Sequence, residues 1–160
     1  MQSTSDIIKY AIEHEVKAKV FYTEANELAS KGESMMVFLE LIEMEEAHAR
    51  HLVDVFGDLL KADGIDGDAF LADLESRTHG VLGDNERKLL EDADMKPVLE
   101  FAMAMEEKAR DAYKELATRM DDPKLRELCG ELAQEEQEHY ELLAEARIGA
   151  DSPMDDRPML

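Results

Sequence analysis

Four long stretches of the chain repeat apolar residues every three or four positions, which is the spacing of one face of an α-helix. These stretches cover residues 6–31, 34–63, 95–120 and 123–148. Ser5, Asp6 and Asp122-Pro123 can cap helix starts, and Gly32 can end a helix. The pattern predicts an all-α protein, a four-helix bundle made of two antiparallel hairpins.

Residues 64–94 connect the two hairpins and contain only short helical patterns, at about 68–77 and 85–91. The second and third long helices must run parallel if both hairpins pack in one bundle. The connection must therefore cross the length of the bundle, about 40 Å. We expect one domain over residues 1–149 with this crossover inside it, and a flexible tail over residues 150–160.

Acidic and histidine residues interrupt the apolar faces of all four helices. They are Glu15, Glu45, His48, Glu106, Glu136 and His139. An unpaired carboxylate in a core costs several kcal/mol, so these residues need partners. A buried polar network without an ion is the alternative to a binding site.

The interruptions belong to an internal repeat. Glu15, Tyr22, Glu45 and His48 recur, each 91 positions later, as Glu106, Tyr113, Glu136 and His139. A constant offset across two helices and a turn indicates a duplicated hairpin. Within each hairpin the Glu and His positions average to the predicted turn. We therefore expect all six to lie at one height in the bundle.

The composition excludes some classes of binding partner and favours others. Asp and Glu outnumber Lys and Arg by 39 to 18, a formal net charge of −21. Such a chain repels nucleic acid and anionic membranes, and favours cations. The only cysteine, Cys129, excludes an internal disulfide or a four-cysteine iron site within this sequence. Because neither a signal-peptide pattern nor an apolar run of about 20 residues is present, we expect a soluble cytoplasmic protein.

Glu-x-x-His places two ligands on one helix face, one turn apart. One Glu from each of two helices and Glu-x-x-His from each of the other two is a di-metal arrangement found in four-helix bundles. Four carboxylates balance the charge of two divalent ions, and this donor set suits iron or manganese and accepts zinc. Without metal we expect raised carboxylate pKa values and a melting temperature that increases when metal is added.

These residues resemble the ferritin-like di-iron carboxylate superfamily, and within it the rubrerythrin group. The resemblance covers residues 6–64 and 95–148. It implies a ferritin-like bundle binding two iron ions, with Glu15 and Glu106 as terminal ligands, Glu45 and Glu136 as bridging ligands, and one histidine per ion. It also implies that Tyr22 and Tyr113 donate hydrogen bonds to ligand carboxylates.

The sequence departs from the patterns of these families in four features. Ala109 stands where a typical rubrerythrin has an additional carboxylate, and the single cysteine cannot form a rubredoxin domain within this sequence. Bacterioferritin has a haem-binding methionine where this chain has Glu46, and a fifth helix where it has Ser152-Pro153. We therefore expect a stand-alone domain.

The remaining candidate residues have simpler interpretations. We expect His14, His51 and His79 at the surface or the rim, and Glu43, Glu46, Glu135 and Glu138 in solvent. Cys129 and the ten methionines are interpreted as core residues. Met35, Met36 and Val37 lack an obvious partner within the chain and favour a homodimer.

Three functions fit. The first is a di-iron oxidoreductase that reacts with hydrogen peroxide or dioxygen, in oxidative stress or iron metabolism, and takes electrons from an external donor such as a rubredoxin. The second is a ferroxidase that oxidises iron for storage or detoxification. The third is a non-catalytic metal-binding helical module.

Overall fold

The computed structural model describes residues 3–28, 33–77, 82–91 and 94–151. Four long helices are α1 (Thr4–Leu28), α2 (Glu33–Ala62), α5 (Met95–Arg119) and α6 (Pro123–Asp151). Two short ones, α3 (Gly67–Ser76) and α4 (Asp84–Glu91), lie in the crossover. The long helices begin and end within three residues of the predicted positions. The tail beyond Asp151 and His79 lie outside the described residues.

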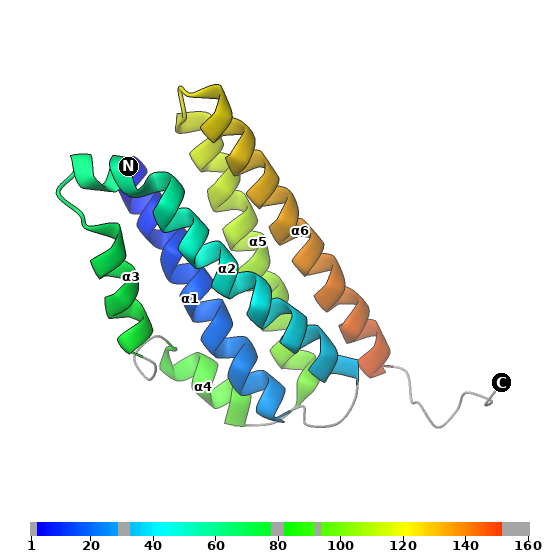
Figure 1. The fold of residues 1–160 in the computed structure, drawn as a ribbon. Helices are drawn as coiled ribbons and strands as arrows, with labels where there is room; N and C mark the ends of the chain where they lie inside the picture. The colour runs from blue at the N-terminus through cyan, green and yellow to red at the C-terminus, as the bar shows by residue number, and fades with distance from the viewer. Residues whose placement is uncertain (1–2, 29–32, 78–81, 92–93, 152–160) are drawn as a thin grey trace.

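The bundle consists of two antiparallel hairpins, as predicted. α1 packs against α2 and α5 against α6, and the hairpins meet through contacts of α1 with α5 and of α2 with α6. α2 and α5 run in the same direction (Figure 1). α3 packs along α2 and α1, and α4 contacts α1 and α5 at one end, so the crossover returns the chain along the outside of the first hairpin (Figure 1).

Aspartate and serine side chains set the helix starts. Ser3, and not Ser5 or Asp6, caps α1: its hydroxyl accepts from the Asp6 amide, and the Asp6 carboxylate accepts from the Ser3 amide. Asp94 and Asp122 accept backbone hydrogen bonds at the starts of α5 and α6. These caps fix where α1, α5 and α6 begin, and therefore which of their residues face the bundle axis.

Two hydrophobic clusters fill the bundle, one toward each end. The first contains Ile8 and Phe56, and the second contains Phe38 and Leu99. Along α1 the first cluster reaches Val16 and the second begins at Ala18, so the level of Glu15 is the boundary between them. The interrupting acidic and histidine residues form a polar layer between two apolar ones.

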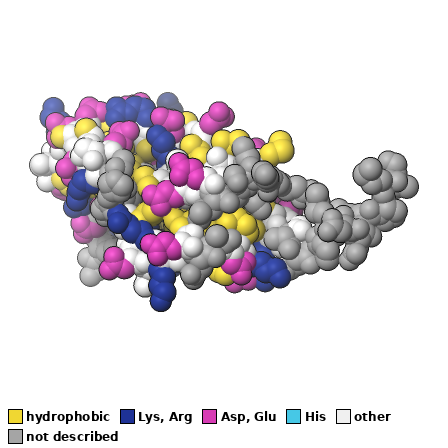
Figure 2. All heavy atoms as spheres, turned by 90° about the horizontal axis from the view of Figure 1, so that it is seen from below, with side chains coloured by type: hydrophobic (Ala, Val, Ile, Leu, Met, Phe, Trp, Pro, Cys, Tyr) yellow, Lys and Arg dark blue, Asp and Glu magenta, His cyan; other side chains and the backbone are white. Residues whose placement is uncertain are grey.

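The surface differs from the predictions at a few positions. The apolar spacing of residues 34–63 predicts that Leu59 faces inward, but Leu59 is exposed, while Leu60 is buried. Met36 is 74 % exposed, whereas Val37 packs partly against the second cluster, and the Met35 side chain is outside the described part. Figure 2 views the end where α4 lies and shows acidic and hydrophobic side chains mixed over that face. Among the described residues no helix is long and apolar enough to cross a membrane.

Candidate metal centre

The polar layer brings together the six predicted ligands from all four long helices. Glu15, Glu45, Glu106 and Glu136 have no exposed surface, and His139 is 3 % exposed. The His48 side chain is 14 % exposed. We call these six residues the ligand cluster. Side chains from α1, α2, α5 and α6 reach one level because the two hairpins carry the same motif at the same distance from their turns.

Most nitrogen–oxygen distances between the cluster side chains are too long for hydrogen bonds and suited to metal coordination. The exception is His139 Nδ1, which lies 3.1 Å from Glu45 Oε1 although neither atom forms a hydrogen bond. His48 Nδ1 lies 3.7 Å from Glu15 Oε2 and 3.7 Å from Glu136 Oε1. His139 Nδ1 lies 3.5 Å from both Glu106 Oε2 and Glu136 Oε2. Two ligands that each bind one ion at about 2.1 Å are roughly 3.0 to 4.2 Å apart. The cluster has the spacing of donors around shared ions.

Unsatisfied buried atoms concentrate at this layer. Among the described residues, buried side-chain oxygen and nitrogen atoms without a hydrogen-bond partner occur on the ligand cluster, on His14 and, elsewhere, on Asn26 alone. Both oxygens of Glu45 and both of Glu136 are in this condition. Buried polar atoms ordinarily form hydrogen bonds. A set of unpaired oxygen and nitrogen atoms that converge on one centre therefore fits a bound cation.

Two overlapping groups of potential ligands are present. Glu45 and Glu136 belong to both, one group adding Glu15 and His14 and the other adding Glu106 and His139, with ligand atoms within 4.8 Å of one another in each group. Two carboxylates shared between two groups are the arrangement expected of bridging ligands. We call Glu15 with His48 the Glu15 site, and Glu106 with His139 the Glu106 site.

The tyrosines pair across the hairpins. Tyr22 of the first hairpin donates to Glu106 Oε1, and Tyr113 of the second donates to Glu15 Oε1 at 2.6 Å. Both rings are completely buried, and burial together with the nearby carboxylates raises both pKa values well above 10. Each hydroxyl therefore stays protonated and holds one oxygen of a carboxylate from the other hairpin, leaving the second oxygen free.

The carboxyl pKa values are not uniformly raised, contrary to the sequence-based expectation. Burial, followed by the charges of Glu15 and Glu106, raises the pKa of Glu136 well above 4.5. Burial acts the same way on Glu106, but contacts with Glu136, His139 and His14 outweigh it and hold its pKa well below 4.5. The negative charge of either carboxylate opposes ionisation of the other, so the two groups titrate as a pair in which Glu136 is the harder to ionise.

Two residues differ from their predicted surroundings. His14, expected at the surface, is 6 % exposed and faces the cluster, while His51 is exposed as predicted. Glu135, expected in solvent, has its Oε2 2.7 Å from His48 Nε2. The sequence held one signal for His14: its counterpart in the repeat is the apolar Met105, which is also buried. Glu43, Glu46 and Glu138 are exposed as predicted.

The sequence model of the rubrerythrin family matches residues 6–147. The chain belongs to the rubrerythrin family. This family is one of the ferritin-like di-iron carboxylate proteins, and its match covers all four long helices and the crossover. No curated protein and no solved structure matches the chain. Family membership and the buried carboxylate and histidine cluster together indicate metal binding.

Proposed function

We propose that the protein is a di-iron oxidoreductase of the rubrerythrin type that reacts with hydrogen peroxide or dioxygen and takes electrons from an external donor. The main support for this proposal is the set of buried oxygen and nitrogen atoms in the ligand cluster that have no hydrogen-bond partner. In it Glu15 and Glu106 are terminal ligands, Glu45 and Glu136 bridge, and His48 and His139 bind one ion each. Residues 1–149 form the domain that holds the site.

Two bound iron ions would supply electron transfer to the oxidant. The chain contributes charge balance, since four carboxylates offset two divalent ions. Tyr22 and Tyr113 hold the terminal carboxylates, and the two hydrophobic clusters exclude bulk water above and below. A cavity of about 580 Å³ between α1, α2 and α3 is lined by Glu15 and Glu45 and offers a route for a small oxidant.

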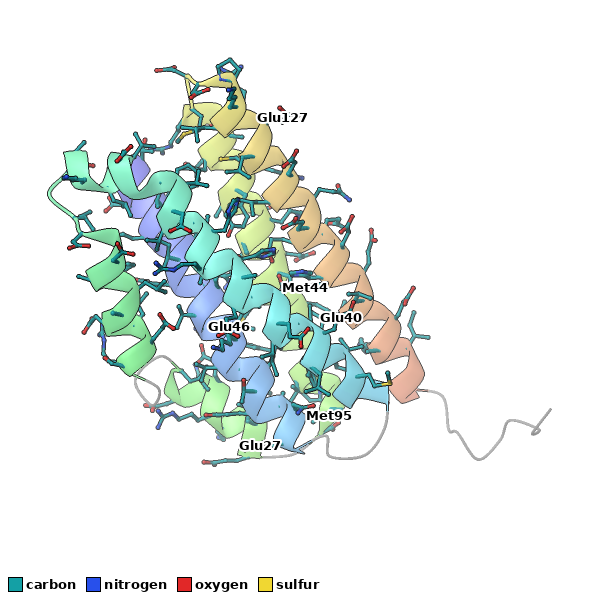
Figure 3. All side chains as sticks on the ribbon, viewed as in Figure 1. Glu27, Glu40, Met44, Glu46, Met95 and Glu127 are labelled. Atoms are coloured by element: carbon teal, nitrogen blue, oxygen red, sulfur yellow. The ribbon has the colours of Figure 1, made fainter. Side chains whose placement is uncertain are left out.

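Iron oxidation for storage or detoxification is the second candidate, and a different cavity favours it. This cavity, about 470 Å³ between α2 and α6, includes both His48 and His139. Its other walls carry Glu40, Glu135, Glu138, Glu141 and Glu145. Figure 3 shows Glu40 and Met44 on the side of α2 that faces α6. An acidic opening that leads to two potential ligands would concentrate ferrous ions.

Iron reconstitution without oxygen, followed by stopped-flow absorbance, tests the proposal. We expect about two iron ions per chain and rapid oxidation by peroxide. Glu45→Ala should lose both ions, because this carboxylate belongs to both ligand groups. Glu46→Ala is the matched control: Glu46 is the next residue, its side chain is 66 % exposed, and its loss should leave the iron content unchanged.

The same experiment separates the candidates. Faster reaction with dioxygen and continued uptake of iron would favour iron oxidation for storage. Tight binding of zinc with no redox reaction of the iron-loaded protein would favour a non-catalytic module. Fewer than about one ion per chain, or binding that survives Glu45→Ala, would contradict the metal centre itself.

A further inference from the structure

The cluster contains a third histidine that breaks the repeat. His14 is one residue before Glu15, and its counterpart 91 positions later is Met105. Both side chains are buried, at 6 % and 7 % exposure, on the adjacent helices α1 and α5. The first half of the molecule therefore places an imidazole where the second half places a thioether.

His14 lies at a coordination distance from the carboxylates. Its Nε2 is 3.9 Å from Glu106 Oε2 and 3.9 Å from Glu136 Oε2, and it has no hydrogen-bond partner. Hydrogen bonds from a ring nitrogen are about 2.7–3.2 Å long, whereas two ligands of one ion are roughly 3.0 to 4.2 Å apart. Because the side chain is only 4 % exposed, bulk water cannot satisfy this nitrogen.

The potential ligand groups indicate which ion His14 would bind. Its Nε2 is close to Glu106, but His14 shares a group of ligand atoms with Glu15, Glu45 and Glu136, and the group that contains Glu106 includes His139 instead. We propose that His14 is a seventh metal ligand, bound to the ion of the Glu15 site. This inference rests on the proposed metal centre. The Glu15 site then has two imidazoles, His14 and His48, and the Glu106 site has one.

Unequal ligand sets give unequal metal preferences. Imidazole suits iron, cobalt and zinc, whereas sites dominated by carboxylate suit manganese and magnesium. The Glu15 site should therefore be the first to bind a divalent ion such as iron, cobalt or zinc, and should discriminate more strongly against manganese. The Glu106 site, with Met105 in the corresponding position, should bind second and discriminate less.

Cobalt(II) binding to the full chain tests this assignment without any turnover. Bound Co(II) shifts the NMR signals of the imidazoles that ligate it, and signals are assigned by their loss in single histidine variants. We expect shifted signals from His14, His48 and His139. A titration should show two unequal affinities, and His14→Ala should weaken the tighter one by on the order of tenfold to a hundredfold. Met105→Ala, the counterpart change, should leave it within about twofold.

His14→Gln separates ligation from hydrogen bonding. The glutamine amide can donate to Glu106 from nearly the position of Nε2, but it is a poor ligand compared with imidazole. We expect the same loss of affinity as in His14→Ala. Wild-type affinity in His14→Gln, together with shifted signals from His48 and His139 only, would overturn the assignment and leave the six-ligand centre intact. Absence of Co(II) binding to the unmodified chain would instead contradict the centre itself.

Discussion

The two hairpins carry the same motif, yet the surroundings of the motif differ. Glu15, Tyr22, Glu45 and His48 match Glu106, Tyr113, Glu136 and His139 in type and in spacing. The residues beside them do not match, because two positions that are polar in one half are methionine in the other. The candidate ligands of the motif are thus duplicated, while the residues that surround them are not.

The first difference is His14 against Met105, and the second is Glu135 against Met44. Glu135 Oε2 contacts Nε2 of His48, the nitrogen that points away from the cluster. The counterpart of Glu135 is Met44, which lines the same cavity as His139. A carboxylate on the outer nitrogen orients an imidazole and increases its basicity, and a thioether does so far less. Both differences would strengthen metal binding at the Glu15 site.

Removing a carboxylate shared by both sites should have the largest effect on metal content, because both sites lose a ligand and no longer differ. Glu136→Ala should eliminate both metal ions, whereas Glu106→Ala should eliminate one and leave the Glu15 site occupied. Metal content after dialysis measures both. Glu138→Ala, two residues further along α6 and exposed, is the control and should retain both ions. Equal loss in Glu106→Ala and Glu136→Ala would show that the two sites are not separable.

The tyrosines should act on the site of the opposite hairpin. Tyr22→Phe removes the donor to Glu106, and Tyr113→Phe removes the donor to Glu15. Each variant should lower the affinity of the corresponding ion by about tenfold to a hundredfold, and leave the other ion unaffected. A Co(II) titration resolves the two ions. The prediction fails if Tyr22→Phe weakens the Glu15 site.

Loss of the Glu135 contact should have a smaller effect of the same kind. Glu135→Gln should lower the affinity of the Glu15 site by about tenfold, since the neutral amide supports the His48 ring less well than a carboxylate. Glu141→Gln, in the same acidic cavity and exposed, is the control for the loss of one charge. Equal effects of the two substitutions would indicate general electrostatics and not a specific contact.

The smallest effect concerns the metal-free protein. The pKa of Glu136 is raised above 4.5, so the folded chain holds a proton there that the unfolded chain releases. Burial lowers the pKa of His14, His48 and His139, but the nearby carboxylates outweigh it, leaving all three pKa values above 6.5. Groups with raised pKa values lose their stabilising contribution as pH increases. The lowered pKa of Glu106 stabilises the fold above pH 4.5, and this contribution is lost only as the pH falls below 4.5.

The melting temperature of the chelator-treated protein should therefore decrease between about pH 5 and pH 8. The metal-loaded protein should show the opposite trend, because binding requires deprotonated ligands. Thermal unfolding by circular dichroism across this range measures both. An increase for the metal-free protein would contradict the direction of the Glu136 and histidine shifts.

The helices and the alignment of the cluster could be predicted because they depend on local patterns. A period of three to four residues determines which face of a helix is apolar, and the turn positions determine which residues are level. Because of the constant offset of 91, each prediction made for one hairpin also applies to the other. These relations hold whatever the detailed packing of the helices.

Positions at the edge of a helix face could not be predicted in this way. His14 is displaced by about 100° from Glu15 around α1, so its burial depends on what lies beside that helix. α1 contacts α2, α3, α4 and α5, which buries a wide arc of its surface. Leu59 and Leu60 illustrate the same uncertainty, since the residue predicted inside is exposed and its neighbour is buried.

The sequence alone determined the four long helices, the duplicated hairpin and the six residues of one polar layer, because each follows from periodicity along the chain. Only the tertiary structure decided that each tyrosine binds the carboxylate of the other hairpin, that Glu135 meets His48, and that His14 faces the cluster. These contacts join different helices, and their partners depend on how the helices are rotated and packed against one another.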